Sequence, residues 1–347
     1  MCTLRGKSAF FWLFLLMCLL AGRPSAKAQA WPNGYNYRRA ITIAHTKVSN
    51  TDQANFPVVV SSTFSYLATT SNGGNVTSAS GYDIIFTSDS AGSSTLAFER
   101  ENYNPATGAA TFWVKIPTLS HTSDTVFYMF YGNSSVTTDQ SNKTGVWDSN
   151  YALVYHLSEN AANTTVSDST ANANTGANSA NTSTKTTAGQ IANALTYAST
   201  SSDTTTIADS ASLRITGAVS FEGWIQTTST NATNLWRSYQ NSSPYSGYGI
   251  GYSIGGAGKM SYWSSAHGSW VISNTAVNDG AWHHVVVTVS SSGGVSFYRD
   301  GVADGTQGSS VPAAYTGART VGDAGFTGAV DELRISNVAR SADWVLA

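Results

Sequence analysis

The sequence predicts an all-β protein made of two tandem β-sandwiches. Short apolar runs between clusters of Gly, Asn, Asp and Ser dominate the chain, and helical periodicity is scarce. Asp300-Gly301 stands between two such runs and is a hairpin signal, because both central positions of a type I′ turn need a positive φ. The roughly 317 residues that follow a 30-residue N-terminal segment are enough for two domains of ordinary size.

Residues 1–30 have the features of a secretory signal peptide. Arg5 and Lys7 precede an apolar run from Phe10 to Leu20, and Ala28-Gln29-Ala30 is a small-x-small cleavage site. The run is shorter than the ~20 apolar residues of a membrane span; an uncleaved N-terminal anchor is the alternative. We expect a protein that is secreted or held at the cell surface, with no membrane span after cleavage near Ala30.

The composition of the mature chain excludes two classes of function. Cys2 and Cys18 both lie in the signal segment, so the mature chain has neither a disulfide nor a cysteine nucleophile. The segment holds four of the 18 basic residues, which leaves 14 against 20 acidic residues and a net charge of −6. No basic patch is present, and nucleic acid is therefore not an expected partner.

The first sandwich is predicted over residues 31–150. A single helical turn is expected at 64–67, and the polar stretch 137–149 is the expected junction with the second domain. The expected strands are 40–43, 56–60, 83–87, 111–116 and 125–131.

Four segments of this region resemble a bacterial domain-of-unknown-function family. They are Tyr37–Ile43, Phe98–Glu101, Phe112–Pro117 and Phe130–Asn133, taken together and in this order. The family often precedes laminin-G-like domains in exported multidomain proteins. It has no established chemistry, so the resemblance implies a β-domain and an exported context but no site residues.

The second sandwich is predicted over residues 151–347. Asp279–Val289, Val295–Gly301 and Phe326–Ile335, with strands expected at 152–157, 193–197, 219–225, 248–254 and 259–263, resemble the laminin-G-like branch of the concanavalin A-like lectin/glucanase superfamily. The resemblance implies a concanavalin A-like jelly roll and a secreted binding module more than an enzyme. The polar stretch 179–188 is expected to form a flexible loop.

No catalytic residue is assigned. Glucanases of the wider superfamily present carboxylates from alternate positions of one strand, where they share a face. Only Glu99 and Glu101 have this spacing near Arg100, and an edge-strand charge pattern explains them better. His283 and His284 are adjacent, so on a strand they face opposite sides and cannot share a metal ion.

Calcium is the ion that the sequence favours most. It needs six to eight oxygen ligands, and the loop Asp168–Gly176 offers carboxylate, amide and carbonyl oxygens. In laminin-G-like domains a calcium ion often lies at such a loop near the last strand, so the resemblance implies Asp168 and Asp331 as ligands. The alternative is that Asp168 forms an Asx-type turn and Asp331 caps the bend of the last strand.

Aromatic residues gather between Trp236 and Trp270. Tyr248, Ile250, Tyr252 and Ile254 alternate and are expected to form one buried sheet face. Because Trp236, Tyr239 and Tyr245 lie in a polar segment, they are the candidates for an exposed ligand-binding surface, since flat rings with a polar tip suit sugar faces. Ordinary core or rim packing is the alternative.

The leading hypothesis is a non-catalytic exported module that binds carbohydrate or a surface glycoconjugate and holds calcium in a loop. A structural or adhesive spacer of a larger cell-surface protein is the second hypothesis, and a glycoside hydrolase is the third. The sequence does not determine the ligand or the oligomeric state, because function depends on the site and not on the fold.

Overall fold

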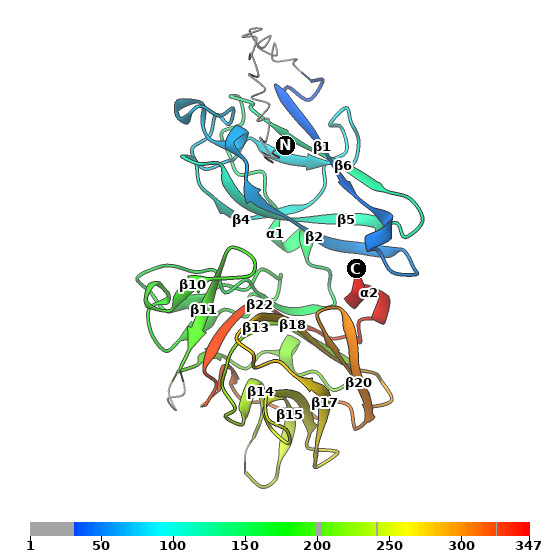
Figure 1. Cartoon of the computed structure of the whole chain (residues 1–347). Helices are drawn as coiled ribbons and strands as arrows, with labels where there is room; N and C mark the ends of the chain where they lie inside the picture. The colour runs from blue at the N-terminus through cyan, green and yellow to red at the C-terminus, as the bar shows by residue number, and fades with distance from the viewer. Residues whose placement is uncertain (1–30, 199–202, 241, 324) are drawn as a thin grey trace, which may run out of the picture.

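The computed structural model describes residues 31–347 except 199–202, 241 and 324; the predicted signal peptide lies outside the described residues. The regular secondary structure of the described chain is almost all β, and it forms two sandwiches stacked on one another, as Figure 1 shows. The predicted fold class is therefore confirmed. No helix within the described residues is long and apolar enough to cross a membrane.

The first sandwich consists of two antiparallel three-stranded sheets. Phe86, Phe98 and Phe112 meet edge to face between them, with ring centroids 5.2–6.3 Å apart, and form the centre of its core. The predicted helical turn is present as a 3-10 turn at Ser65–Leu67. One sheet has the order β1 (Tyr37–Ile43), β6 (Thr125–Tyr131), β3 (Ile84–Thr87); the other has β2 (Gln53–Thr63), β5 (Ala109–Leu119), β4 (Phe98–Tyr103).

The second sandwich consists of two larger antiparallel sheets that enclose one apolar core. The sheet that faces the first domain runs β10 (Thr186–Ala188), β11 (Asn193–Tyr197), β22 (Gly328–Ser336), β13 (Val219–Gln226), β18 (Trp282–Val289), β19 (Gly294–Arg299), β20 (Val302–Gly308), with β7 (Tyr151–Tyr155) also paired to β22. The far sheet runs β17 (Trp270–Ala276), β16 (Lys259–Ser264), β15 (Ser246–Tyr252), β14 (Thr233–Gln240), β21 (Arg319–Val321), β12 (Thr205–Ile207), β9 (Gly176–Asn178), β8 (Thr165–Val166).

The hairpin between β19 and β20 follows from its two turn residues. Asp300 has φ 52° and Gly301 has φ 74°, the two positive values that a type I′ turn requires. The prediction of a flexible loop at 179–188 is wrong in part, because that stretch holds a 3-10 turn at Thr182–Thr184 and strand β10. Hydroxyl groups stabilise it: the Ala161 amide donates to Thr182 Oγ1 at 3.0 Å.

The two domains pack through a short aromatic layer. The helix α1 (Lys143–Val146) leads into Trp147, whose ring centroid lies 5.5 Å from that of Trp113 on β5. At the other end of the contact, the helix α2 (Ala342–Leu346) places Trp344 with its ring centroid 4.7 Å from that of Phe56 on β2. Figure 1 shows α2 beside the lower edge of the first domain.

Candidate functional site

The site begins with a strand whose outer face carries no side chains. β15 reads Ser-Gly-Tyr-Gly-Ile-Gly-Tyr, and its alternation turns Tyr248, Ile250 and Tyr252 into the core, where each is at most 1% exposed. The predicted buried sheet face is therefore confirmed over these three residues. Gly247, Gly249 and Gly251 lie on the opposite face, where the strand therefore has no side chains of its own.

Neighbouring aromatic rings occupy the space above these glycines. A Cβ atom on Gly249 would lie 2.8 Å from the ring of Tyr239, and one on Gly251 would lie 2.7 Å from Trp270 Cζ3. Both distances are shorter than van der Waals contact, so any larger residue would push the rings away from the strand. The glycines therefore let the rings of β14 and β17 lie directly on the sheet.

Four aromatic residues meet at this place and line what we call the aromatic pocket: Tyr239, Tyr245, Trp263 and Trp270, with Ser265 and Gly268. The ring centroids of Tyr239 and Trp263 are 4.9 Å apart, and those of Trp263 and Trp270 are 6.2 Å apart. Tyr245, on the loop between β14 and β15, is 60% exposed and stands at 80° to the Trp263 ring. The pocket has a volume of about 310 Å³.

Polar groups lie beside the rings. Asn234 Nδ2 donates to the Tyr239 hydroxyl at 3.0 Å and to Asp323 Oδ2 at 3.1 Å, and Arg237 Nη1 lies 3.5 Å from that same Asp323 oxygen. Burial raises the pKa of Tyr239, so its hydroxyl stays protonated at neutral pH. Because that oxygen accepts from Asn234, its own proton is free to donate to a ligand.

The structure corrects one of the three predicted ligand-binding residues. Trp236 is fully buried in the core, so the prediction that it lies on the surface is wrong. The cause is a β-bulge: Asn234 pairs with Gly251 but Trp236 pairs with Ile250, which turns the two side chains to opposite faces of the sheet. Tyr239 and Tyr245 both line the aromatic pocket.

Sequence reasoning missed Trp263 and Trp270 as pocket residues. Trp263 pairs with Gly249 on one side and with Trp270 on the other, so all three share the outer face of the sheet. The signal that would have found them is the glycine alternation of β15. A strand that has glycine at every outward position needs large side chains on its neighbours to cover it.

Asp168 forms the turn that was the alternative to calcium binding. Its Oδ1 accepts from the backbone amides of Val154 and Thr170 at 3.0 Å, and its Oδ2 accepts from the Thr170 hydroxyl and the Asn174 amide at 2.8 Å. The hydrogen bond from the Thr170 backbone N–H to Asp168 Oδ1 is the one that defines an Asx turn. The Val154 bond holds the loop against β7, and the others fix the shape of the loop.

Asp331 is fully buried on β22. Its Oδ2 accepts from the Ile191 amide at 2.8 Å, and its Oδ1 has no hydrogen-bond partner. Burial raises the pKa of Asp331 to about 8, with a further contribution from the charge of Glu332. Within the described residues, the convergent group of metal-ligating side chains includes neither Asp168 nor Asp331. Calcium binding at these two residues stays a prediction.

The hydrogen bonds of Asp168 give a test of its role. We expect Asp168→Ala to lower the free energy of unfolding by about 1–3 kcal/mol, because it leaves buried backbone amides without partners. Urea unfolding with calcium and with chelator should show the same loss. If calcium instead raises the midpoint of the wild type and not that of the variant, Asp168 is an ion ligand.

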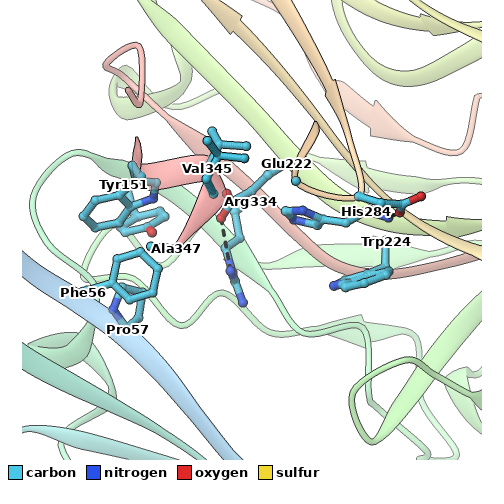
Figure 2. Close-up of a pocket in the computed structure, with 13 residues that line it drawn as sticks. Phe56, Pro57, Tyr151, Glu222, Trp224, His284, Arg334, Val345 and Ala347 are labelled. Atoms are coloured by element: carbon cyan, nitrogen blue, oxygen red, sulfur yellow. Dashed lines mark hydrogen bonds and ion pairs between the residues drawn. The ribbon is translucent and has the colours of Figure 1, made fainter. Parts of the chain in front are cut away.

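A second hollow, of about 360 Å³, lies between the two domains (Figure 2). Glu222 Oε1 accepts from Arg334 Nη1 at 3.1 Å, and the rings of Trp224 and His284 lie 5.1 Å apart beside this pair. Figure 2 shows Phe56 and Pro57 of β2 on the opposite wall. Burial lowers the pKa of His284, so its ring is neutral at pH 7.

Two family matches agree with this architecture. Residues 80–184 match a domain of unknown function, DUF2341, and residues 198–346 match the concanavalin A-like lectin/glucanases superfamily. The chain therefore carries these two domain types in the order that the sequence predicted. A search of curated protein sequences found no match.

Solved structures with similar folds include three protein domains. That of Paraclostridial Mosquitocidal Protein 1 is 12% identical, with a TM-score of 0.47 over 57% of this chain and 51% of that chain. Domain 4 of AbnA, a GH43 arabinanase from Geobacillus stearothermophilus solved with arabinotriose, is 19% identical, with a TM-score of 0.41 over 56% and 96%. The ligand-binding domain of botulinum neurotoxin serotype D, solved with N-acetylneuraminic acid, is 14% identical, with a TM-score of 0.44 over 59% and 52%. The chain thus spans about half the length of the first and third of these structures. TM-scores below 0.5 do not indicate a shared function.

Proposed function

We propose that the second domain binds carbohydrate through the aromatic pocket, as a non-catalytic module of an exported protein. The observation that carries the proposal is the meeting of Tyr239, Tyr245, Trp263 and Trp270 over a strand that has only glycine on that face. The exposed ring of Tyr245 does not contribute to the core, because the core lies on the other side of the sheet.

The chemistry of the pocket suits a sugar ring. Aromatic faces pack against the apolar C–H face of a pyranose, and a polar tip at the ring edge reaches its hydroxyl groups. Tyr239 supplies a hydroxyl donor in the pocket wall, and Asn234 holds that hydroxyl by donating to it. A volume of about 310 Å³ is at the lower end of the range for small-molecule sites, which is about 300–1,000 Å³. A terminal sugar or a short stretch of chain fits this size.

The charges near the pocket favour a neutral glycan. Arg237, which pairs with Gly249 beneath the aromatic rings, lies against Asp323, so its charge is compensated. The mature chain has a net charge of −6, which opposes binding of acidic polysaccharides at long range. We therefore propose neutral glycans at a cell surface or in the surrounding medium as the ligand class.

A glycan array tests this proposal. We expect the wild type to retain neutral glycans and the double variant Tyr245→Ala/Trp270→Ala to lose at least 90% of the signal, because two ring faces are removed from one small site. Val302→Ala is the matched control, since Val302 is 67% exposed in the same domain and away from the pocket.

Two results would count against the proposal. One is a wild type that retains no glycan while its circular dichroism shows a folded β-protein. The other is binding that survives in the double variant, which would move the site elsewhere. Retention of acidic glycans alone would contradict the proposed ligand class and leave the pocket as the site.

A further inference from the structure

A cluster of buried charged side chains lies where the two domains meet. Glu99 and Glu101 come from β4, the edge strand of the first domain. The second domain supplies His156, directly after β7, and Glu332, on β22. The side chains of Glu101 and Glu332 are each 2% exposed, and those of Glu99 and His156 are each 8% exposed. The predicted edge-strand position of the two glutamates is confirmed, but their side chains face the other domain and not water.

The imidazole of His156 is surrounded by carboxylates. Its Nδ1 lies 2.9 Å and 3.0 Å from the two oxygens of Glu332 and 3.6 Å from Glu101 Oε2. Its Nε2 lies on the other side of the ring, 3.2 Å from Glu99 Oε2. One ligand atom each from Glu101, His156 and Glu332 can be chosen so that all lie within 4.8 Å of one another. Nδ1 and two carboxylates thus face one common point.

One carboxylate of this group is incompletely satisfied. Trp113 Nε1 donates to Glu101 Oε2 at 2.9 Å, but Glu101 Oε1 is buried without a hydrogen-bond partner. A buried carboxylate oxygen normally has a partner, because leaving it without one costs several kcal/mol. Glu101 Oε1 is therefore a buried acceptor that a bound cation would satisfy.

The charge balance of the cluster points the same way. Arg334 donates to Glu222 at 3.1 Å and to Glu332 at 2.7 Å, and its guanidinium lies over the rings of Trp113 and Trp147. Four glutamates in this group thus face Arg334 and His156. Even with a charged imidazole, two positive charges face four carboxyl groups, so the cluster can accept a further cation.

The backbone is strained at one of these positions. Glu332 has φ 52°, in the left-handed region that non-glycine residues rarely adopt. It lies at the irregularity where the pairing of β13 with β22 shifts register between Glu222 and Trp224. Strain of this kind persists where the surrounding structure requires a side chain to point in one direction. At Glu332 the carboxylate is directed at His156.

We propose that Glu101, His156 and Glu332 bind a divalent transition-metal ion of the zinc class between the two domains. Zinc binds histidine nitrogen and carboxylate oxygen, and in its open sites it takes three protein ligands with a water molecule in the fourth position. The nitrogen ligand favours zinc over calcium, which prefers oxygen ligands. Glu99 is a positioning residue: a metal-bound histidine usually donates its other N–H to a carboxylate, and Glu99 lies at Nε2.

This site would join the domains, because Glu101 belongs to the first and the other two ligands belong to the second. Arg334 lines the hollow of Figure 2 and also contacts Glu332, so this one side chain lies between the hollow and the proposed site. The inference does not rest on carbohydrate binding, because the aromatic pocket is formed by the far sheet of the second domain.

Calorimetric titration of the untagged, chelator-treated protein with zinc chloride tests the proposal. We expect one ion per chain, release of protons on binding because His156 must lose one, and a rise in the unfolding midpoint. Calcium chloride should give none of these. Glu101→Gln and His156→Gln should each weaken zinc binding at least 100-fold, and Glu99→Gln should weaken it about 10- to 100-fold. Glu159→Gln, outside the three-ligand group but with a charge that acts on His156 and Glu332, should weaken it less than tenfold.

Three outcomes would overturn the proposal. The first is a folded wild type that binds no zinc. The second is zinc binding that is unchanged in folded Glu101→Gln and His156→Gln, which would assign it to exposed pairs such as His45 with Asp124. If these variants do not fold, X-ray absorption at the zinc edge of the wild-type complex decides: one imidazole and oxygen ligands at about 2.0–2.2 Å are expected. A third overturning outcome is two or more imidazoles at the ion.

Discussion

Trp236→Ala is expected to lower the free energy of unfolding by about 3–5 kcal/mol, which is the usual cost of removing a fully buried large aromatic side chain. Trp236 is 0% exposed and belongs to the core of the second sandwich. Urea denaturation followed by circular dichroism measures the loss. Stability is lost because the substitution leaves a cavity. The strands on either side of β14 hold the backbone in place, so the cavity cannot close.

Tyr245→Ala is the matched comparison for Trp236→Ala. Tyr245 is 60% exposed, so its removal should change the free energy of unfolding by less than about 0.5 kcal/mol. A loss below about 1 kcal/mol for Trp236→Ala would contradict the burial of Trp236. Trp236 would then again be a candidate for the ligand-binding surface.

Arg334→Ala should have an effect of similar size at the domain contact. It leaves Glu222 and Glu332, 11% and 2% exposed, without their shared cation. Breaking a buried ion pair by removing one partner costs about 3–5 kcal/mol, because an uncompensated charge remains. The lost stacking on Trp113 and Trp147 adds to this. The free energy of unfolding, from urea titration without added metal, is the measurement.

Arg237→Ala controls for the loss of an arginine from an ion pair. Arg237 is 34% exposed and lies 3.5 Å from Asp323, so solvent screens the pair and the cost should stay within about 1 kcal/mol. Equal losses in Arg334→Ala and Arg237→Ala would mean that the interdomain charges are solvated.

Local patterns predicted much of the fold. The hairpin at Asp300-Gly301 depends on two neighbouring residues, and the buried face of Tyr248, Ile250 and Tyr252 depends on alternation within one strand. The surface prediction for Trp236 was wrong because it rested on the polar residues around it. Composition does not reveal the β-bulge that turns the Trp236 side chain into the core.

The interdomain cluster could not be placed from sequence alone. Its members come from β4, from the residue after β7 and from β22, and only the packing of two domains brings them together. One signal was present in the sequence. The mostly apolar strands β13 and β22 contain the charged residues Glu222, Glu332 and Arg334. In a chain with only 11% charged residues, such positions indicate a buried polar contact, although not its partner.

Calorimetric titration with a soluble neutral oligosaccharide retained in the array screen is the most direct test that the aromatic pocket binds carbohydrate. We expect Tyr245→Ala to weaken binding at least tenfold, which is 1.4 kcal/mol, and Tyr245→Phe to keep affinity within about threefold because the ring remains. Val302→Ala should bind as the wild type does. Equal affinity of Tyr245→Ala and wild type would contradict the account.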